Sequence, residues 1–345
     1  MATEIEAPID SDIPIIDAHH HLFDRANPIV EHVMRRTRFF VDEYTDYLDD
    51  GHNVVASVVV ESQSMYRADG PDELRAVGQT EFHNGLGAMG ASGSYRGIRV
   101  AAGIVGPIDL SMPTTLSTLK AHIAAAPARF KGVRQEALWD EDPSILAGVF
   151  DHGPGMYLGE SFRRGFAHLA PLGLTFDAFV LAPQLPDIVD LARTFPDTSI
   201  VLDHLGHPLG IGRHTGRMEE ERPQWEADMR AIALCKNVTV KMGGLGSFMS
   251  GSPTFLAHPP ASSEQLAAEW RPYVETTIEL FGADRTMFES NLPTDGSGPF
   301  GHVCNAYQRL TATCSQAERE AIFAGTAAKV YGLTDLLTST GKHRP

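Results

Sequence analysis

The stretch Ile13-Pro-Ile-Ile-Asp-Ala-His-His-His-Leu-Phe23 contains an apolar run, then an aspartate and three consecutive histidines. An apolar run of this length predicts a buried strand. Side chains alternate along a strand, so His19 and His21 are predicted to share a face with Asp17, whereas His20 points away. Two imidazoles on one face at a strand end can bind a divalent metal ion, although such pairs also occur as surface or hydrogen-bonded core histidines.

The composition of the chain excludes several classes of partner. Its 345 residues are 43% hydrophobic and carry a formal net charge of −16. Nucleic acids and acidic membranes require clustered Lys and Arg, which no stretch supplies. No run of about 18 apolar residues predicts a membrane span. The N-terminal residues lack a signal pattern, and the three cysteines lack metal-type spacing. We therefore expect a cytoplasmic protein with a small-molecule substrate, and neither nucleic acid nor membrane as a partner.

Short apolar segments alternate with helical segments along the whole chain. This alternation predicts a parallel sheet with right-handed crossovers, and eight repeats predict a (β/α)8 TIM barrel in the α/β class. The alternative is an open doubly wound sheet, but no Gly-X-Gly-X-X-Gly turn follows the first strand. The predicted strands lie in 13–23, 54–61, 100–105, 130–138, 174–181, 199–206, 238–242 and 286–293. The predicted helices are 40–51, 71–89, 115–125, 160–169, 185–195, 225–235, 264–281, 304–313 and 316–331.

No low-complexity linker divides the chain. We expect one barrel domain over 13–335, with a flexible segment at 1–12 and a tail at 336–345. Three insertions follow predicted strands, and the loops after strands form the face of a barrel where active sites lie. These insertions are 62–96, 207–223 and 246–262.

Polar side chains stand at the carboxyl end of nearly every predicted strand. A buried strand that ends in an ionisable group loses hydration energy unless that group is paired or binds a ligand. The set therefore predicts a functional site at the mouth of the barrel. It comprises His19, His21, Glu61, Arg134, Glu136, Asp177, Asp203, His204, Lys241, Glu289 and Asn291.

Several motifs spread from residue 15 to residue 333 resemble those of the amidohydrolase superfamily. The resemblance is strongest to its amidohydrolase-related (amidohydrolase 2) branch of TIM-barrel metal-dependent hydrolases. The motifs are Asp17-Ala-His-His-His-Leu, Lys131-Gly-Val-Arg, Leu202-Asp-His-Leu-Gly, Phe288-Glu-Ser-Asn-Leu-Pro and Gly325-Thr-Ala-Ala-Lys-Val-Tyr.

The resemblance implies roles for the matched positions. His19 and His21 resemble metal ligands of the first strand. His204 resembles a histidine that either polarises the substrate or completes the metal site. Arg134 resembles an arginine that holds a substrate carboxylate, which suits its planar guanidinium.

Three positions depart from the pattern of the superfamily. Asn291 replaces an aspartate that binds metal and moves the proton of the attacking water. An asparagine can bind metal through its carbonyl oxygen but cannot act as a base, so we expect Glu289 or Asp295 to take that part. Ala182 and Gln135 stand where related chains often carry histidines.

Two kinds of site fit these observations. The first is a mononuclear metal site with open coordination for water, in which His19, His21 and His204 supply nitrogen and Glu289, Asn291 or Asp177 adds oxygen. The second is a degraded or purely structural site in a chain whose partner carries out the chemistry. The mixed ligand set suits zinc first, with manganese or iron as alternatives. We also expect Tyr66, on the loop after the second strand, to donate a hydrogen bond to the substrate.

Three functions remain open on this basis. The first is hydrolysis of a small carboxylated substrate, such as a lactone or other cyclic ester, with His204, Glu289 and Asp295 as catalytic groups. The second is a subunit of a hetero-oligomeric monooxygenase resembling a two-subunit aminoisobutyrate hydroxylase. The third is a non-catalytic subunit that stabilises an active homologue. We expect a homo-oligomer, or a hetero-oligomer with a homologous chain.

Overall fold

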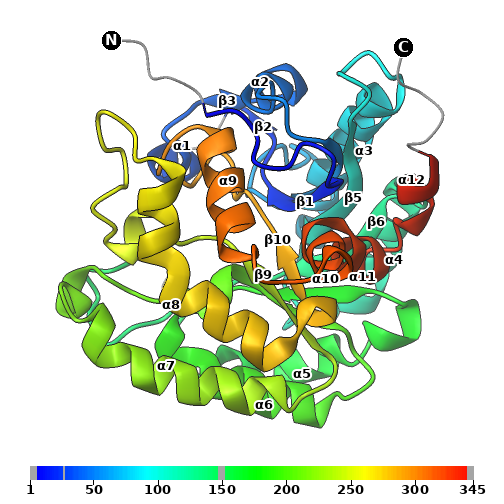
Figure 1. Cartoon of the computed structure of the whole chain (residues 1–345). Helices are drawn as coiled ribbons and strands as arrows, with labels where there is room; N and C mark the ends of the chain where they lie inside the picture. Colours follow the sequence, from blue (N-terminus) through cyan, green and yellow to red (C-terminus); the bar gives the residue numbers. More distant parts are fainter. Residues whose placement is uncertain (1–5, 26–27, 147–151, 340–345) are drawn as a thin grey trace.

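Eight parallel strands form one sheet that closes into a barrel in the computed structural model, which describes residues 6–25, 28–146 and 152–339 (Figure 1). The strands are paired in the order β1-β4-β5-β6-β7-β8-β9-β10. This order confirms the predicted (β/α)8 barrel. The strands are β1 Ile15–His20, β4 Val54–Val60, β5 Arg99–Pro107, β6 Phe130–Arg134, β7 Thr175–Ala178, β8 Ile200–Leu202, β9 Val238–Met242 and β10 Thr286–Phe288.

Backbone hydrogen bonds just beyond the two edge strands close the barrel. The amide of His21 donates to the carbonyl of Leu292 at 2.8 Å, and the amide of Asn291 donates to the carbonyl of His19 at 2.9 Å. We call this junction the seam. Residues predicted to bind metal therefore also join the first strand to the last.

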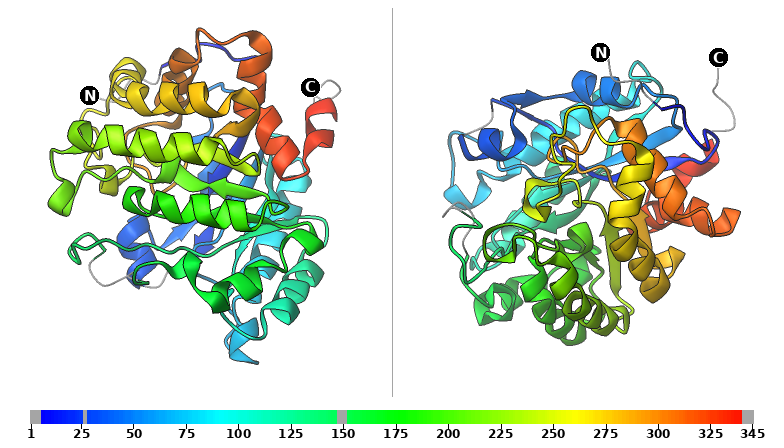
Figure 2. Two further views of the ribbon diagram at one scale, coloured as in Figure 1. Left: turned by 90° about the horizontal axis from the view of Figure 1, so that it is seen from below. Right: turned by 60° about the vertical axis from the view of Figure 1, so that its left-hand side comes forward.

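Helices surround the barrel, and α6 to α9 lie side by side on its outside (Figures 1 and 2). Their buried faces pack against the outward side chains of the strands, while small and β-branched residues such as Ala18, Val58 and Val201 fill the barrel interior. The helices are α1 Pro28–Met34, α2 Val41–Tyr47, α3 Val77–Ala91, α4 Thr115–Ala125, α5 Glu160–Phe166, α6 Leu185–Thr194, α7 Met218–Ala233, α8 Ser263–Phe281, α9 Phe300–Leu310, α10 Gln316–Glu320, α11 Thr326–Val330 and α12 Thr334–Ser339.

Several predicted strands were too long. The segments 130–138, 199–206 and 286–293 end as strands at Arg134, Leu202 and Phe288. After Leu202 the chain turns, with His204 and Leu205 in the left-handed region at φ values of 56° and 58°. Polar residues that were predicted within strands therefore lie on turns beyond them.

Some helical boundaries also differ from the predictions. α7 begins at Met218 rather than at 225, with three glutamates in its first turn, where the helix dipole favours negative charge. Pro223 lies within this helix. The short helix α1 and the two-stranded pair of β2 (Phe23–Asp24) and β3 (Arg38–Phe39) were not predicted.

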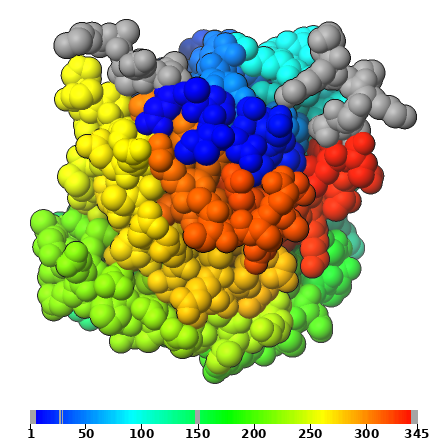
Figure 3. All heavy atoms as spheres, in the orientation of Figure 1, coloured from blue at the N-terminus to red at the C-terminus, as the bar shows by residue number. Residues whose placement is uncertain are grey.

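Parts of the predicted N-terminal segment and of the predicted C-terminal tail contact the barrel domain. Residues 6–12 lie along α9, where the amide of Ile9 donates to Asn305 at 3.0 Å and the amide of Asp10 donates to Gln308 at 2.9 Å. Figure 3 shows this dark-blue segment against the orange part of the chain. The helix α12 continues to 339, beyond the predicted domain end. Residues 1–5 and 340–345 lie outside the described part of the chain. No helix in the described ranges is both long and apolar enough to cross a membrane.

Candidate active site

Three buried side chains at the carboxyl ends of β1 and β8 form a potential metal-binding group. Each of these residues offers one ligand atom, and the three atoms lie within 4.8 Å of one another. The residues are His19, Asp203 and His204. All three residues are at most 2% exposed. Their imidazole nitrogens and carboxylate oxygens are donors that zinc, manganese and iron accept.

Asp203 and His204 both face this group although they are neighbours in sequence. Strict alternation along a strand would send one of them outward. The strand ends at Leu202, and His204 adopts a left-handed conformation, which removes the alternation. Gly244 permits the resulting close approach, because a Cβ atom there would lie 2.5 Å from the Cβ of His204.

Asp203 was noted at a strand end but was not predicted as a ligand. Neither of its carboxylate oxygens accepts a hydrogen bond from the described residues. Lys241 lies 3.0 Å and Arg134 3.5 Å away as ion-pair partners. Burial opposes ionisation of Asp203, but Lys241 and His19 outweigh it and hold its pKa well below the usual range. A buried, ionised carboxylate with unsatisfied oxygens fits a bound cation.

His21 lies beside this group and has the tautomer that a metal ligand needs. Its Nδ1 atom is 2.9 Å from the carbonyl oxygen of Glu61, so Nδ1 carries the proton and donates it. The unprotonated Nε2 atom is 3.3 Å from Nε2 of His19. Burial, followed by the charges of His19 and Arg134, lowers the pKa of His21 well below its usual value, so the ring stays neutral.

Glu289 joins the two histidines of the group. Its Oε1 accepts from Nδ1 of His204 at 2.8 Å, and its Oε2 lies 3.1 Å from Nδ1 of His19. Burial opposes ionisation of Glu289, but His204 and His19 lower its pKa to about 2. Burial likewise lowers the pKa of His204, and the charge of Glu289 outweighs burial and raises it. This pairing leaves Nε2 of His204 as the ring atom that can exchange a proton in the pocket.

Asn291 presents its carbonyl oxygen as an unsatisfied acceptor. Its amide nitrogen donates to Oδ1 of Asp295 at 2.7 Å, and the amide oxygen has no hydrogen-bond partner among the described residues. Burial raises the pKa of Asp295 to about 7. Asp295 does not line the pocket, so it reaches the site through Asn291.

Asp177, a predicted oxygen ligand, is engaged elsewhere. Its Oδ2 accepts from Lys241 at 2.6 Å and from the hydroxyl of Tyr331 at 2.8 Å. Lys241 also lies between Asp177 and Asp203. Burial lowers the pKa of Lys241, but these two carboxylates outweigh burial and raise it, so the ammonium remains charged. Asp177 therefore balances a buried charge beneath the metal-binding group.

Arg134, the predicted carboxylate ligand, is already paired with Glu61. Its Nε and Nη2 atoms donate to Oε1 of Glu61 at 2.9 and 2.7 Å, and Nη2 also donates to the Glu61 carbonyl at 2.9 Å. The remaining Nη1 atom lies 3.3 Å from Nε2 of His19. Glu61 was noted at a strand end, but its pairing with Arg134 was not predicted.

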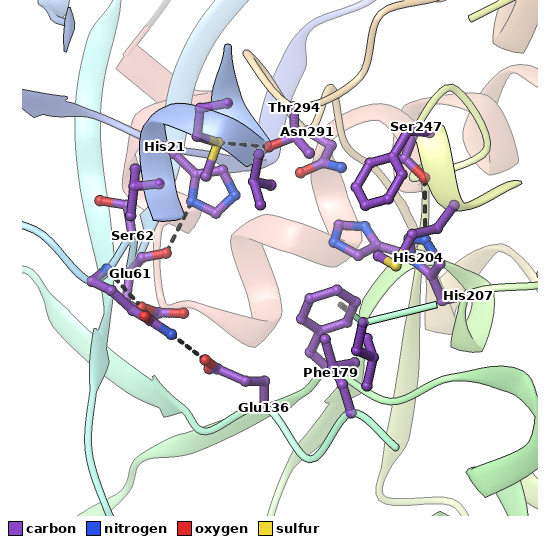
Figure 4. Close-up of a pocket in the computed structure, with 18 of the residues that line it drawn as sticks. His21, Glu61, Ser62, Glu136, Phe179, His204, His207, Ser247, Asn291 and Thr294 are labelled. Atoms are coloured by element: carbon purple, nitrogen blue, oxygen red, sulfur yellow. Dashed lines mark hydrogen bonds between the residues drawn. The ribbon is translucent and has the colours of Figure 1, made fainter. Parts of the chain in front are cut away.

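A pocket with about 990 Å³ of space, including its open mouth, lies above these groups. His21, Arg134, His204 and Asn291 line it, whereas His19 lies below. Figure 4 shows Glu61 and Glu136 facing one side of this space and His204 with His207 facing another. Gln63 donates to Glu136, and both also line an adjoining pocket.

Tyr66 was predicted to contact the substrate. It lines the adjoining pocket but not the pocket above the metal-binding group. It is 40% exposed. Its place in a substrate complex remains a prediction.

Asp17 does not share the face of His19. The pairing register of β1 shifts between Asp17 and His20. Asp17 instead accepts from the hydroxyls of Tyr44 at 2.8 Å and Ser290 at 2.6 Å. His20 stacks on Tyr44 at 4.0 Å between ring centroids. The irregular register explains why simple alternation misplaced Asp17.

Comparison with known proteins finds relatives that match part or nearly all of this chain. A relative from Sinorhizobium fredii, the uncharacterized protein y4mH, is 29% identical over 334 residues, covering 93% of this chain and 99% of the relative. An L-fucono-1,5-lactonase from Burkholderia multivorans is 28% identical over 176 residues, covering 50% of this chain and 56% of that protein.

A solved structure shares the fold along nearly its full length. An amidohydrolase from Burkholderia multivorans with bound zinc superposes with a TM-score of 0.70 at 21% identity, covering 92% of this chain and 99% of that one. The family described as Amidohydrolase matches residues 16–333. This chain therefore belongs to the amidohydrolase family and is a metal-dependent hydrolase of the amidohydrolase superfamily.

Proposed function

We propose that the chain hydrolyses a lactone at the floor of the pocket. The observation that carries this proposal is the hydrogen-bonded pair of His204 and Glu289 beside the metal-binding group. Such a pair can move a proton between water and a leaving oxygen. The relative described as an L-fucono-1,5-lactonase supports a cyclic ester as the substrate.

His19 and Asp203 would hold the metal ion together with Nε2 of His21, which leaves Nε2 of His204 free to move a proton. Glu289 or Asn291 offers a further oxygen atom. When bound, zinc or a similar divalent ion supplies Lewis acidity toward water and the ester carbonyl. The metal identity remains a prediction, with zinc first and manganese or iron as alternatives.

The proton moves through His204 in this proposal. Glu289 accepts the hydrogen bond from Nδ1 and so leaves Nε2 of His204 to take a proton from the attacking water. The oxygen of that water forms a bond to the ring carbonyl carbon, and the ester C–O bond of the ring breaks. Nε2 then returns its proton to the departing alkoxide, which gives a hydroxy acid.

Other predicted roles are less direct in this geometry. Asp295 can influence proton transfer only through its hydrogen bond to Asn291. A substrate carboxylate on Arg134 would have to compete with Glu61. None of the relatives described above is called a monooxygenase, and that alternative remains a prediction. The non-catalytic subunit and the oligomeric state also remain predictions.

A substitution at Glu289 tests the proposed function. Metal-loaded wild type should release acid from a panel of lactones, and Glu289→Gln should lower kcat by about 10²–10³-fold. Because the carboxylate that raises the pKa of His204 is removed, the rising limb of the pH–rate profile should also move to lower pH. Metal content is measured on the same samples.

The matched control is Glu220→Gln, an exposed position on α7 with the same change of charge. It should keep wild-type kcat and the wild-type pH profile. Failure of the wild type to open any lactone, or wild-type kcat in Glu289→Gln, would overturn the proposed function.

A further inference from the structure

The walls of the pocket are mostly apolar. One group of side chains comes from α1, and another comes from the loops after β6, β7 and β9. The second group belongs to a small hydrophobic cluster of its own, separate from the main core. Representative lining residues are Val30, Val33, Met34, Leu138, Phe179 and Phe248.

The charges on the pocket lining do not favour an anion. Arg134 is the one guanidinium among the described lining residues, and Glu61 accepts two of its hydrogen bonds. The second carboxyl group, Glu136, faces the same space and is bonded to Gln63. A carboxylated substrate that used Arg134 would leave Glu61 buried without its partner, which is unfavourable.

We propose that the pocket selects a neutral lactone that carries an alkyl or aryl substituent. This inference rests on the proposed lactone hydrolysis and names the substrate class of the same site. The ester ring lies at the floor beside His204, and the substituent contacts Val33, Phe179 and Phe248. Removing such a substituent from water favours binding roughly in proportion to its apolar area.

A panel of six-membered lactones tests this inference. It contains the unsubstituted ring, alkyl-substituted rings with one to five carbon atoms, a polyhydroxylated ring and a ring bearing a carboxylate. We expect kcat/KM to rise about threefold per methylene over the alkyl series. The pentyl lactone should exceed the hydroxylated and carboxylated lactones by about 200-fold, as the area buried predicts.

The outcomes separate this inference from the proposed function. Hydrolysis of lactones with a preference for the hydroxylated or carboxylated ring overturns the apolar selection and leaves the proposed function standing. Hydrolysis of no lactone overturns both. A flat alkyl series also overturns the apolar selection.

Two substitutions on α1 locate the preference in the pocket. Val33→Lys places a cation on the lining, whereas Glu31→Gln makes the same change of charge at an exposed position outside the lining. Val33→Lys should shift the kcat/KM ratio toward the carboxylated lactone by at least about tenfold. Glu31→Gln should change it less than about twofold, because solvent screens an exposed charge.

A conservative variant covers the case in which Val33→Lys does not fold. Val33→Thr keeps the shape and adds a hydroxyl, so it should lower the preference for the pentyl lactone by severalfold. An unchanged ratio in whichever variant folds, or an equal shift in Glu31→Gln, would show that α1 does not select the substrate.

Discussion

Two adjacent histidines of β1 belong to clusters of opposite character. The inner cluster consists of His19, Asp203, His204, Lys241 and Glu289, and the outer cluster consists of Asp17, His20, Tyr44, Ser57 and Ser290. Both are buried. The inner cluster combines cations with carboxylates, whereas the outer cluster surrounds a single carboxylate with neutral donors.

The two aspartates show what this difference means. Both oxygens of Asp17 accept hydrogen bonds, from Tyr44 and Ser290 among others, although burial raises its pKa to about 6. Neither oxygen of Asp203 accepts one among the described residues. Equal burial therefore has different consequences. The carboxylate of Asp17 has its hydrogen bonds satisfied within the fold, whereas the carboxylate of Asp203 can still accept a ligand.

The largest expected effect comes from removing the inner histidine. His19→Ala deletes a nitrogen donor of the metal-binding group. We expect metal content to fall below about half an equivalent and kcat/KM for lactones to fall at least about 10³-fold, since three protein ligands are the minimum of such sites. Elemental analysis and steady-state kinetics check this. Retention of both metal and activity would show that the inner cluster is not the metal site.

A buried histidine in neither cluster should produce a smaller, pH-dependent effect. His122 stacks on Phe130, and burial lowers its pKa to about 4. The unfolded chain binds a proton on this ring below about pH 6.5, whereas the folded chain does not until about pH 4. Stability is therefore lost as the pH falls between these values, by about 3 kcal/mol in total from this group.

His122→Leu should accordingly reduce the acid sensitivity of the free energy of unfolding, measured by denaturant titration at several pH values. The matched control is Thr80→Val, which removes the hydrogen bond to Nδ1 of His122 but keeps the titrating ring. It should keep the wild-type slope with pH. Equal slopes in wild type and His122→Leu would contradict the prediction.

The smallest expected effect concerns the outer cluster. Tyr44→Phe removes one donor to Asp17 and should lower the free energy of unfolding by about 1–2 kcal/mol. Metal content and kcat should stay within about twofold of wild type. Tyr47→Phe, at a more exposed ring on the same helix, should leave stability nearly unchanged. A loss of metal in Tyr44→Phe would mean that the two clusters are coupled.

The fold could be predicted from the sequence because a barrel repeats the same strand–helix pattern along the whole chain. Alternating strands and helices predicted all eight barrel strands, and burial of apolar strands on both faces left a clear signal. The short α1 and the two-residue strands β2 and β3 carry too few residues for a periodic pattern. They nevertheless matter, because α1 lines the pocket.

The candidate site could be predicted from the sequence only in part, because local turns and distant pairings decide where its side chains lie. His19, His204 and Glu289 were predicted from strand ends and are brought together. Asp203 was predicted to lie at the mouth of the barrel, but the resemblance gave a role only to its neighbour His204, and the left-handed turn that brings both side chains to one group has no signature in the sequence. Asp177 was predicted as a ligand from its place at a strand end, and no sequence pattern reveals its pairing with Lys241, which comes from a distant strand.

The seam gives the site a second physical consequence. The backbone of His19 and His21 bonds to that of Asn291 and Leu292, so the amides that close the barrel belong to residues of the site. Opening the barrel at this junction separates His19 from Glu289. An ion bound at the site would resist that opening, so hydrogen exchange at the amides of His21 and Asn291 becomes a measure of site occupancy.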